Sequence, residues 1–163
     1  MNPLKIYNAN FEGYEYGNSF NVVYDDVNTL AFFAEVKVEI SNTFSLGING
    51  TYNSYSTDLQ SEAWNLPDLK ASIFSNFNIT EKLYGGASLF YVGERNDIDS
   101  VTAEEVTLDG YVDANLHFGY RFTDRLSAFV KGSNLFGDNY EKWMNYPVQG
   151  IQGLVGVTYK FDW

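Results

Sequence analysis

Alternation of apolar and polar positions is the strongest pattern in this sequence. From Phe32 to Ile40, every second side chain is apolar, and Glu35, Lys37 and Glu39 stand between them. A helix would scatter these residues around its axis, whereas a strand separates them onto two faces. The same alternation predicts seven clear strands and a weaker one that precedes them. The eight predicted strands span residues 14–24, 30–41, 44–55, 67–79, 83–93, 108–122, 126–134 and 151–163.

The predicted strands are long for a globular protein. Most have about ten residues or more, whereas ordinary strands have about five or six. A tilted strand needs roughly nine to eleven residues to cross a bilayer. The length therefore favours an all-β, antiparallel up-and-down transmembrane β-barrel, in which the apolar face meets lipid and the polar face lines the interior. Alternation alone leaves open a water-soluble sandwich with the apolar face inside.

The connections between these strands alternate strictly between short and long. The short ones are turns at residues 41–43, 80–82 and 123–125, rich in the Ser, Asn, Thr and Asp that suit tight turns. The long ones span residues 56–66, 94–107 and 135–150. Outer-membrane barrels place short turns on one rim and long loops on the other. This segregation favours a membrane barrel over a sandwich.

Aromatic residues are abundant, with 13 Tyr, 13 Phe and 3 Trp among 163 residues. Many fall near the two ends of the predicted strands, where a bilayer has its interfaces and barrels carry aromatic girdles. A core rich in Tyr and Phe is the alternative. The candidate girdle residues are Phe44, Tyr52, Phe77, Tyr91, Phe122, Tyr159, Phe161 and Trp163.

The composition excludes several classes of protein. The chain has no Cys, which excludes a disulfide scaffold and a Cys-based zinc site. Its net charge of −11 disfavours nucleic-acid binding, because such a surface repels phosphates. No apolar stretch is long enough for a membrane-spanning helix, and the N-terminal residues lack the features of a secretory signal. The length predicts a single barrel domain or barrel segment over residues 1–163.

The polar faces of the strands supply candidates for the barrel interior, where opposite charges could pair and avoid uncompensated burial. These candidates are Glu35, Lys37, Glu39, Lys70, Asp113, His117, Arg121 and Lys131. Any Ser-His-acid triad would need His117, which stands in mid-strand, so we expect no catalysis and no cofactor. The acidic residues from Asp97 to Asp109 predict a solvated loop, with a divalent-cation site as the alternative.

Three aromatic residues stand together in the last long connection. Tyr140, Trp143 and Tyr146 could stack on a sugar or on a hydrophobic ligand. Packing of the loop itself is the other interpretation. The sequence does not identify the ligand.

Several motifs resemble those of a known family. Glu62-Ala63-Trp64-Asn65-Leu66-Pro67 opens one strand, Asn134-Leu135-Phe136 follows another, and Gly156-Val157-Thr158-Tyr159-Lys160-Phe161 lies in the last. Together they resemble the C-terminal part of the β-barrel of TonB-dependent outer-membrane receptors, from about residue 18 to the end. The resemblance implies a barrel portion of an uptake receptor for a siderophore, a cofactor or a glycan. It further implies contact with outer-membrane lipid, and with the TonB system through a plug domain that this chain lacks.

The strand number leaves two arrangements open. Such receptors have barrels of about 22 strands, whereas this chain has seven or eight. Open sheet edges are too costly in hydrocarbon, because each unpaired backbone group costs several kcal/mol. Either the chain closes as a stand-alone eight-stranded barrel with a structural or adhesive role, or the other strands lie outside it. A soluble, lipocalin-like binder of small ligands is a third possibility.

Overall fold

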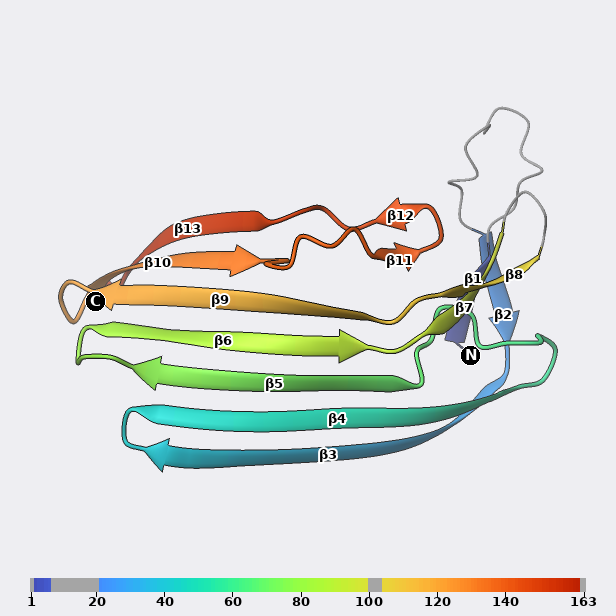
Figure 1. Cartoon of the computed structure of the whole chain (residues 1–163), viewed down its shortest axis with the longest axis horizontal. Helices are drawn as coiled ribbons and strands as arrows, with labels where there is room; N and C mark the ends of the chain where they lie inside the picture. Colours follow the sequence, from blue (N-terminus) through green and yellow to red (C-terminus); the bar gives the residue numbers. More distant parts are fainter. Residues whose placement is uncertain (1, 7–20, 100–103, 162–163) are drawn as a thin grey trace.

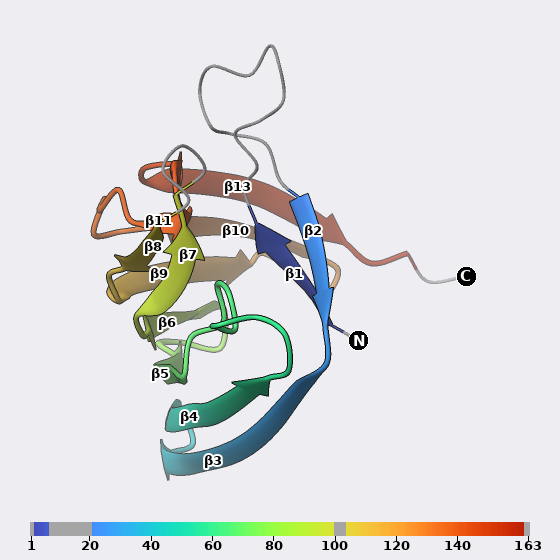
Figure 2. The same ribbon diagram turned by 90° about the vertical axis from the view of Figure 1, so that its right-hand side faces the viewer.

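The computed structural model describes residues 2–6, 21–99 and 104–161, and all regular structure in them is β. Seven antiparallel strands form one sheet in the order β13-β10-β9-β6-β5-β4-β3, which curls into an open arc (Figures 1 and 2). The strands are β3 (Val27–Ser41), β4 (Phe44–Thr57), β5 (Leu69–Asn78), β6 (Leu83–Val92), β9 (Tyr111–Arg121), β10 (Leu126–Ser133) and β13 (Gln152–Tyr159). No helix in the described part of the chain is long and apolar enough to cross a membrane.

Three short hairpins gather at the end of the sheet that carries the long connections (Figure 1). They pair β1 (Asn2–Ile6) with β2 (Asn21–Asp25), β7 (Arg95–Ile98) with β8 (Glu105–Leu108), and β11 (Glu141–Trp143) with β12 (Tyr146–Pro147). The predicted strand at 14–24 is wrong as a strand of the main sheet, because β2 pairs with β1 instead. The part of that prediction before residue 21 lies outside the described residues.

One face of the main sheet is a continuous apolar surface. The cross-strand register places apolar residues opposite one another from strand to strand, so the row continues across the sheet. One such row is Val36, Ile48, Ile73, Leu89 and Ala114. The four larger side chains of this row are exposed, with 59% of Val36 and 45% of Ile73 accessible. A soluble sandwich would bury this face against a second sheet, and no second sheet covers it among the described residues.

Glycines on the sheet make room for aromatic rings on the neighbouring strand. A Cβ at Gly47 would collide with the ring of Phe74, which stands opposite it in the register. A Cβ at Gly119 would collide with Tyr84 in the same way. Both rings lie flat over the partner strand because glycine leaves the space, and they cover backbone that would otherwise be bare.

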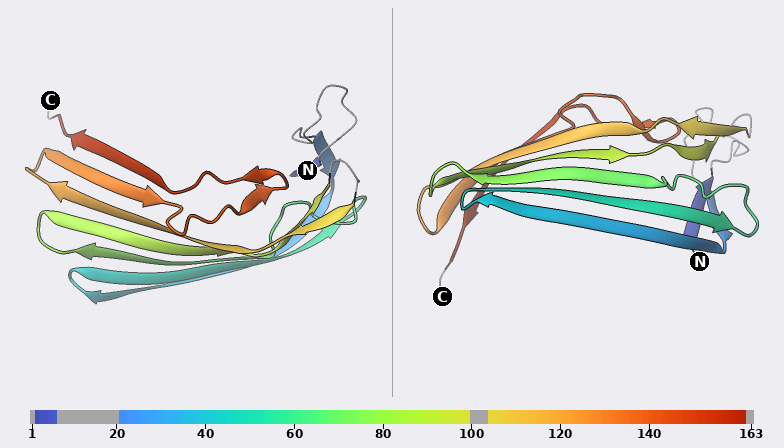
Figure 3. Two further views of the ribbon diagram at one scale, coloured as in Figure 1. Left: turned by 45° about the horizontal axis from the view of Figure 1, so that its top comes forward. Right: turned by 60° about the horizontal axis from the view of Figure 1, so that its bottom comes forward.

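Two of the short turns use a threonine hydroxyl in the same way. Thr80 Oγ1 accepts hydrogen bonds from the backbone N–H groups of Lys82 and Leu83, at 3.2 and 2.9 Å. Thr123 Oγ1 accepts from the N–H groups two and three residues further on, at 3.2 and 3.0 Å. The hydroxyl takes the place of a backbone acceptor, which is why these residues suit tight turns. The short turns meet at the end of the sheet opposite the hairpins, as Figure 3 shows.

The buried side chains of the described residues lie at the hairpin end or beside it. The buried apolar residues are Trp64 and Leu108, both in or next to long connections. The main sheet therefore buries no large apolar side chain among the described residues, and hydrophobic stabilisation of its apolar face depends on what covers that face.

Closure as an eight-stranded barrel is wrong for the described residues. β3 pairs only with β4 and β13 pairs only with β10, so both remain edge strands of an open sheet. The physical reason is that the eighth strand does not join the sheet at either edge. The structure confirms an all-β, antiparallel barrel-type fold, with seven strands in the main sheet of the described residues.

Candidate functional site at the loop end of the sheet

Arg95 holds the second long connection (residues 93–110) against the third (residues 134–151). Its side chain is 5% exposed, and its guanidinium donates to the carbonyl oxygens of Gly93, Asp109, Glu141 and Lys142. It also lies 5.2 Å from the ring centroid of Tyr111. Burial lowers the pKa of Arg95, although Tyr111, Asp97 and Glu141 act in the opposite direction. One side chain therefore holds the start of β11 against β7.

Asp97 also joins the β7–β8 hairpin to the β11–β12 hairpin. It lies two residues after Arg95 on β7 and is fully buried. Its carboxylate accepts hydrogen bonds from the backbone N–H of Ile98 and of Met144, both at 2.9 Å. The prediction of a solvated acidic loop is wrong at this residue, because the carboxylate satisfies the N–H groups of a tight turn. No group of three or more acidic or His residues that could hold a metal ion occurs in the described chain, and the divalent-cation site stays an untested alternative.

The first long connection, residues 58–68, is held by Asp25 and by β7. Asp25 accepts hydrogen bonds from the N–H groups of Leu59 and Gln60, at 2.8–3.1 Å. Desolvation raises the pKa of Asp25, but these backbone donors outweigh it and hold the pKa below its usual 3.8. The N–H of Asn65 donates to the carbonyl of Asn96 at 2.8 Å. All three long connections are thus hydrogen-bonded to one another or to the strands beside them.

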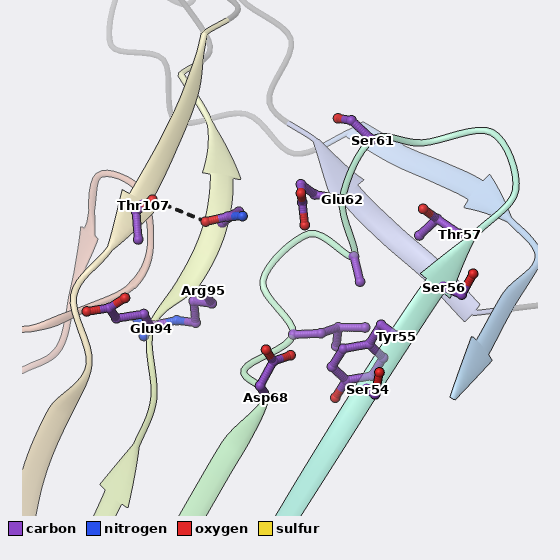
Figure 4. Close-up of a pocket in the computed structure, with 13 residues that line it drawn as sticks. Ser54, Tyr55, Ser56, Thr57, Ser61, Glu62, Asp68, Glu94, Arg95 and Thr107 are labelled. Carbon is purple, nitrogen blue, oxygen red and sulfur yellow. Dashed lines mark hydrogen bonds between the residues drawn. The ribbon is translucent and has the colours of Figure 1, made fainter. Parts of the chain in front are cut away.

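A polar cavity of about 570 Å³ lies between the first connection and β7 (Figure 4). Glu62, Asp68 and Glu94 contribute carboxylates, and serine and threonine hydroxyls from the end of β4 line the other side. Figure 4 also shows the hydroxyl of Thr107 donating to Asn96 at 3.2 Å. The lining is acidic and hydroxylated, and its one cation, Arg95, is already bonded to backbone carbonyls.

A second cavity, here called the aromatic cavity, has a volume of about 460 Å³ and lies between the third connection and the polar face of the sheet. It is lined by Phe90, Asp113, Asn115, Ser133, Asn134, Tyr140, Lys142, Trp143, Tyr146, Pro147, Val148, Gln149 and Gln152. The three aromatic residues predicted as loop ligand contacts therefore line one cavity. The alternation pattern had not predicted that residues of the sheet would complete it.

The wall of the aromatic cavity is fixed by Tyr140. Its ring stacks on Tyr111 with centroids 3.7 Å apart, and its hydroxyl donates to Asp113 Oδ2 at 3.1 Å. Burial, followed by the hydrogen bond to Asp113, raises the pKa of Tyr140 to about 12. Trp143 and Tyr146 meet edge to face, with centroids 6.5 Å apart. Tyr140 is thus fixed in position as part of the cavity wall. Trp143 and Tyr146 also contribute aromatic side chains to the lining.

The eight polar residues predicted for the interior share one face of the main sheet. The register runs from Glu35 through Asn49, Ser72 and Phe90 to Asp113. A second row runs from Glu39 to His117 and Lys131, and Lys37, Lys70 and Arg121 follow the same alternation. Recorded contacts include Asn49 donating to Glu35 at 3.4 Å and Arg121 lying 4.2 Å from the Tyr84 ring centroid. That this face lines a barrel interior stays a prediction.

The candidate girdle aromatics lie towards the two ends of the sheet. Phe44 stands opposite Phe77 next to the short turns, and Phe122, Tyr159 and Phe161 lie at the same end. Tyr52 and Tyr91 are closer to the long connections. Several are exposed, including Phe161 at 73%. Trp163 lies outside the described residues.

These observations define the class of fold. An open antiparallel sheet with one exposed apolar face, short turns at one end and long hydrogen-bonded connections at the other is a segment of an outer-membrane-type β-barrel.

Several solved structures of TonB-dependent receptors share this fold. The copper transporter OprC matches 98% of this chain at a TM-score of 0.74 and 16% identity, over 27% of its own length. The ferric-catecholate import receptor Fiu of E. coli matches 96% at 0.70 and 17% identity, over 23% of its length. The siderophore receptor PiuA of Acinetobacter baumannii matches 98% at 0.66 and 13% identity, over 24% of its length.

At these identities the likeness establishes the fold. The chain spans about a quarter of the length of these receptors. No family model and no curated protein sequence matches it. The similar structures are transport receptors and not enzymes.

Proposed function

We propose that residues 1–163 are a barrel segment of a TonB-dependent outer-membrane receptor that takes up a nutrient and performs no catalysis. The observation that carries this proposal is the exposed apolar surface that continues from β3 to β13. In water such a surface would drive association, whereas in a bilayer it meets acyl chains. The polar face then lines the barrel interior, and the aromatic girdles lie at the two interfaces.

The rest of the receptor would complete what this sheet leaves open. Edge strands β3 and β13 need partner strands within the membrane, because unpaired backbone groups cost several kcal/mol each in hydrocarbon. Further barrel strands and a plug domain would come from sequence outside this chain, and the plug would connect the receptor to the TonB system. The nutrient would be a siderophore, a cofactor or a glycan.

Sided labelling tests this assignment directly. Residues 1–163 contain no Cys, so once any cysteine elsewhere in the receptor is replaced, a single introduced cysteine reports on its own position. In the full-length receptor, Ser61→Cys lies on the first long connection and Asn42→Cys on a short turn, and both residues are exposed. We expect a membrane-impermeant maleimide to label Ser61→Cys in intact cells. Asn42→Cys should react only after the outer membrane is permeabilised.

The opposite pattern, or equal labelling of both positions in intact cells, would contradict the proposed orientation. A receptor recovered entirely in the soluble fraction without detergent would contradict the membrane location itself. Heat-modifiable mobility on gels provides an independent check that a barrel has formed.

A further inference from the structure

The long connections carry an unbalanced charge that restricts the ligand. Their basic residues are Arg95 and Lys142. Their acidic residues are Asp58, Glu62, Asp68, Glu94, Asp97, Asp99, Glu104, Glu105, Asp109, Asp138 and Glu141. Arg95 is 5% exposed and its guanidinium donates to backbone carbonyls of both adjacent connections, so these donors are not available to an anionic ligand. An acidic entrance lowers the local concentration of anions and slows their association.

The aromatic cavity, in contrast, is close to neutral. Its charged residues are Asp113 and Lys142, one of each sign. Asp113 is 3% exposed and already accepts from Tyr140 and from the N–H of Ala114. Apart from these two, the polar groups of the lining include the amides of Asn115, Asn134, Gln149 and Gln152 and the hydroxyls of Ser133, Tyr140 and Tyr146. Each amide offers both donors and an acceptor, which is what hydroxyl groups require.

An unused acceptor also lies at the wall of this cavity. Asn134 is 5% exposed, and its Nδ2 donates to the carbonyl of Gln149 at 2.6 Å. Its Oδ1 is buried and accepts from no donor among the described residues. A buried acceptor without a donor costs about 1–3 kcal/mol, so Asn134 is a lining residue whose carbonyl oxygen still lacks a hydrogen-bond donor.

The geometry of the cavity is set before a ligand enters. Tyr140 is held by its stack on Tyr111 and its bond to Asp113, and Asp97 fixes the N–H of Met144 between Trp143 and Tyr146. The volume of about 460 Å³ falls in the range of small-molecule sites, about 300–1,000 Å³. Aromatic faces beside fixed amides suit a ligand with an apolar ring face and a rim of hydroxyls.

We propose that the aromatic cavity binds a neutral sugar unit of an oligosaccharide, stacked on Trp143 or Tyr146 with its hydroxyls bonded to the surrounding amides. This inference rests on the proposed function, and it names a glycan as the nutrient class. Anionic iron chelates are disfavoured at the same site, because the acidic connections repel them and no free cluster of Arg or Lys lines the cavity in the described residues.

Binding by the full-length receptor in detergent tests the proposal. The probes are neutral hexasaccharides derived from α-glucan, β-glucan, xylan and mannan, each at up to millimolar concentration in a calorimeter. We expect at least one to bind, and Trp143→Ala to weaken that binding about tenfold. Phe136→Ala is the matched control, since Phe136 is an exposed aromatic of the same connection outside the cavity. It should leave the affinity unchanged.

A second variant shows whether weaker binding by Trp143→Ala results only from misfolding of the third connection. Asn115→Ala removes a lining amide from β9 without altering the third connection, and it should also weaken binding several-fold. Absence of binding to all four probes, or equal affinity in wild type and Trp143→Ala, overturns the proposal. A ferric tris-catecholate whose binding depends on Trp143 would also overturn it. If the catecholate result came together with the expected cysteine labelling, the sugar-binding proposal would fail and the uptake-receptor function would remain supported.

Discussion

At the scale of single residues, the informative side chains are charged groups that are buried at the loop end. Arg95 and Asp97 are 5% and 0% exposed, yet Arg95 donates to four backbone carbonyls and Asp97 accepts from two backbone N–H groups. A buried charge is tolerated when hydrogen bonds replace its hydration, and removal of one such group leaves its partners unsatisfied. These two residues therefore determine where the β11–β12 hairpin lies, and with it the wall of the aromatic cavity.

Arg95→Ala should loosen the third connection without disrupting the sheet. Several buried carbonyls would lose their donor, at a cost of about 1–3 kcal/mol for each that water cannot reach. We expect faster hydrogen exchange at residues 141–148 and faster proteolysis of this connection in intact cells. Lys142→Ala is the control, because it removes the same charge from an exposed side chain. Equal protection of wild type and Arg95→Ala would show that Arg95 does not hold the hairpin.

Tyr140 should ionise only in strongly alkaline solution. Its pKa is raised to about 12, so the folded state favours the neutral phenol. The stabilisation is complete below the ordinary tyrosine pKa of about 10 and is lost as the pH rises through 12. The difference in phenolate absorbance between wild type and Tyr140→Phe should therefore develop near pH 12. A difference that develops near pH 10 would mean that Tyr140 is neither buried nor bonded to Asp113.

At the scale of elements, each strand of the main sheet has one apolar face and one polar face. Neighbouring residues on a strand point to opposite faces, and the register continues both faces from β3 to β13. The large side chains that a soluble protein would bury are the exposed ones here. A pair of adjacent substitutions can therefore distinguish the two faces.

Ile73→Arg should impair assembly in the membrane much more than Ser72→Arg. Ile73 is in the middle of β5 on the apolar face, where an arginine costs about 2–4 kcal/mol near the bilayer midplane. Ser72 lies on the polar face, opposite Asn49 and Phe90. The measurement is the fraction of full-length receptor with heat-modifiable mobility in outer-membrane preparations. The reverse order of the two variants would assign the faces the other way round.

At the scale of the whole molecule, the number of strands decides how the sheet can be completed. Each of the seven strands runs opposite to its neighbour, so the edge strands β3 and β13 point in the same direction. They cannot pair antiparallel with each other, either within one chain or between copies around a ring. Closure of an all-antiparallel barrel requires an odd number of further strands, which gives the even total of bacterial barrels.

A disulfide test examines this closure. In the full-length receptor, Val38→Cys with Val157→Cys should form no bond under oxidation, because β3 and β13 are separated by other strands. Val38→Cys with Leu46→Cys is the positive control, since these two residues face each other across β3 and β4. Rapid formation of the first disulfide would show that the two edges meet, and would contradict the open-segment arrangement.

The strands and turns could be predicted because they are encoded by local patterns. The seven alternating segments match the strands of the sheet within a few residues, and the three short turns lie where Ser, Asn, Thr and Asp cluster. The hairpins within the long connections were missed. β7 has only four residues, too few for alternation to stand out, although Arg95 and Asp97 at a spacing of two could have indicated a shared face.

The candidate site was predicted only in part. Tyr140, Trp143 and Tyr146 were singled out because they are aromatic and close in sequence, and they do line one cavity. Asp113, Asn115 and Asn134 complete it from β9 and the end of β10. Their part in the cavity depends on how the third connection folds back over the sheet, which no local pattern reports.

The amino-acid sequence by itself determined which residues form strands, which face of each is apolar, and at which end the short turns lie. These features follow from side-chain alternation and turn chemistry, which act between residues a few positions apart. Only the tertiary structure decided that the sheet stays open at β3 and β13, that Asp97 is buried, and that the aromatic cavity forms. Those outcomes depend on hydrogen bonds between segments distant in the chain, such as Arg95 with Glu141.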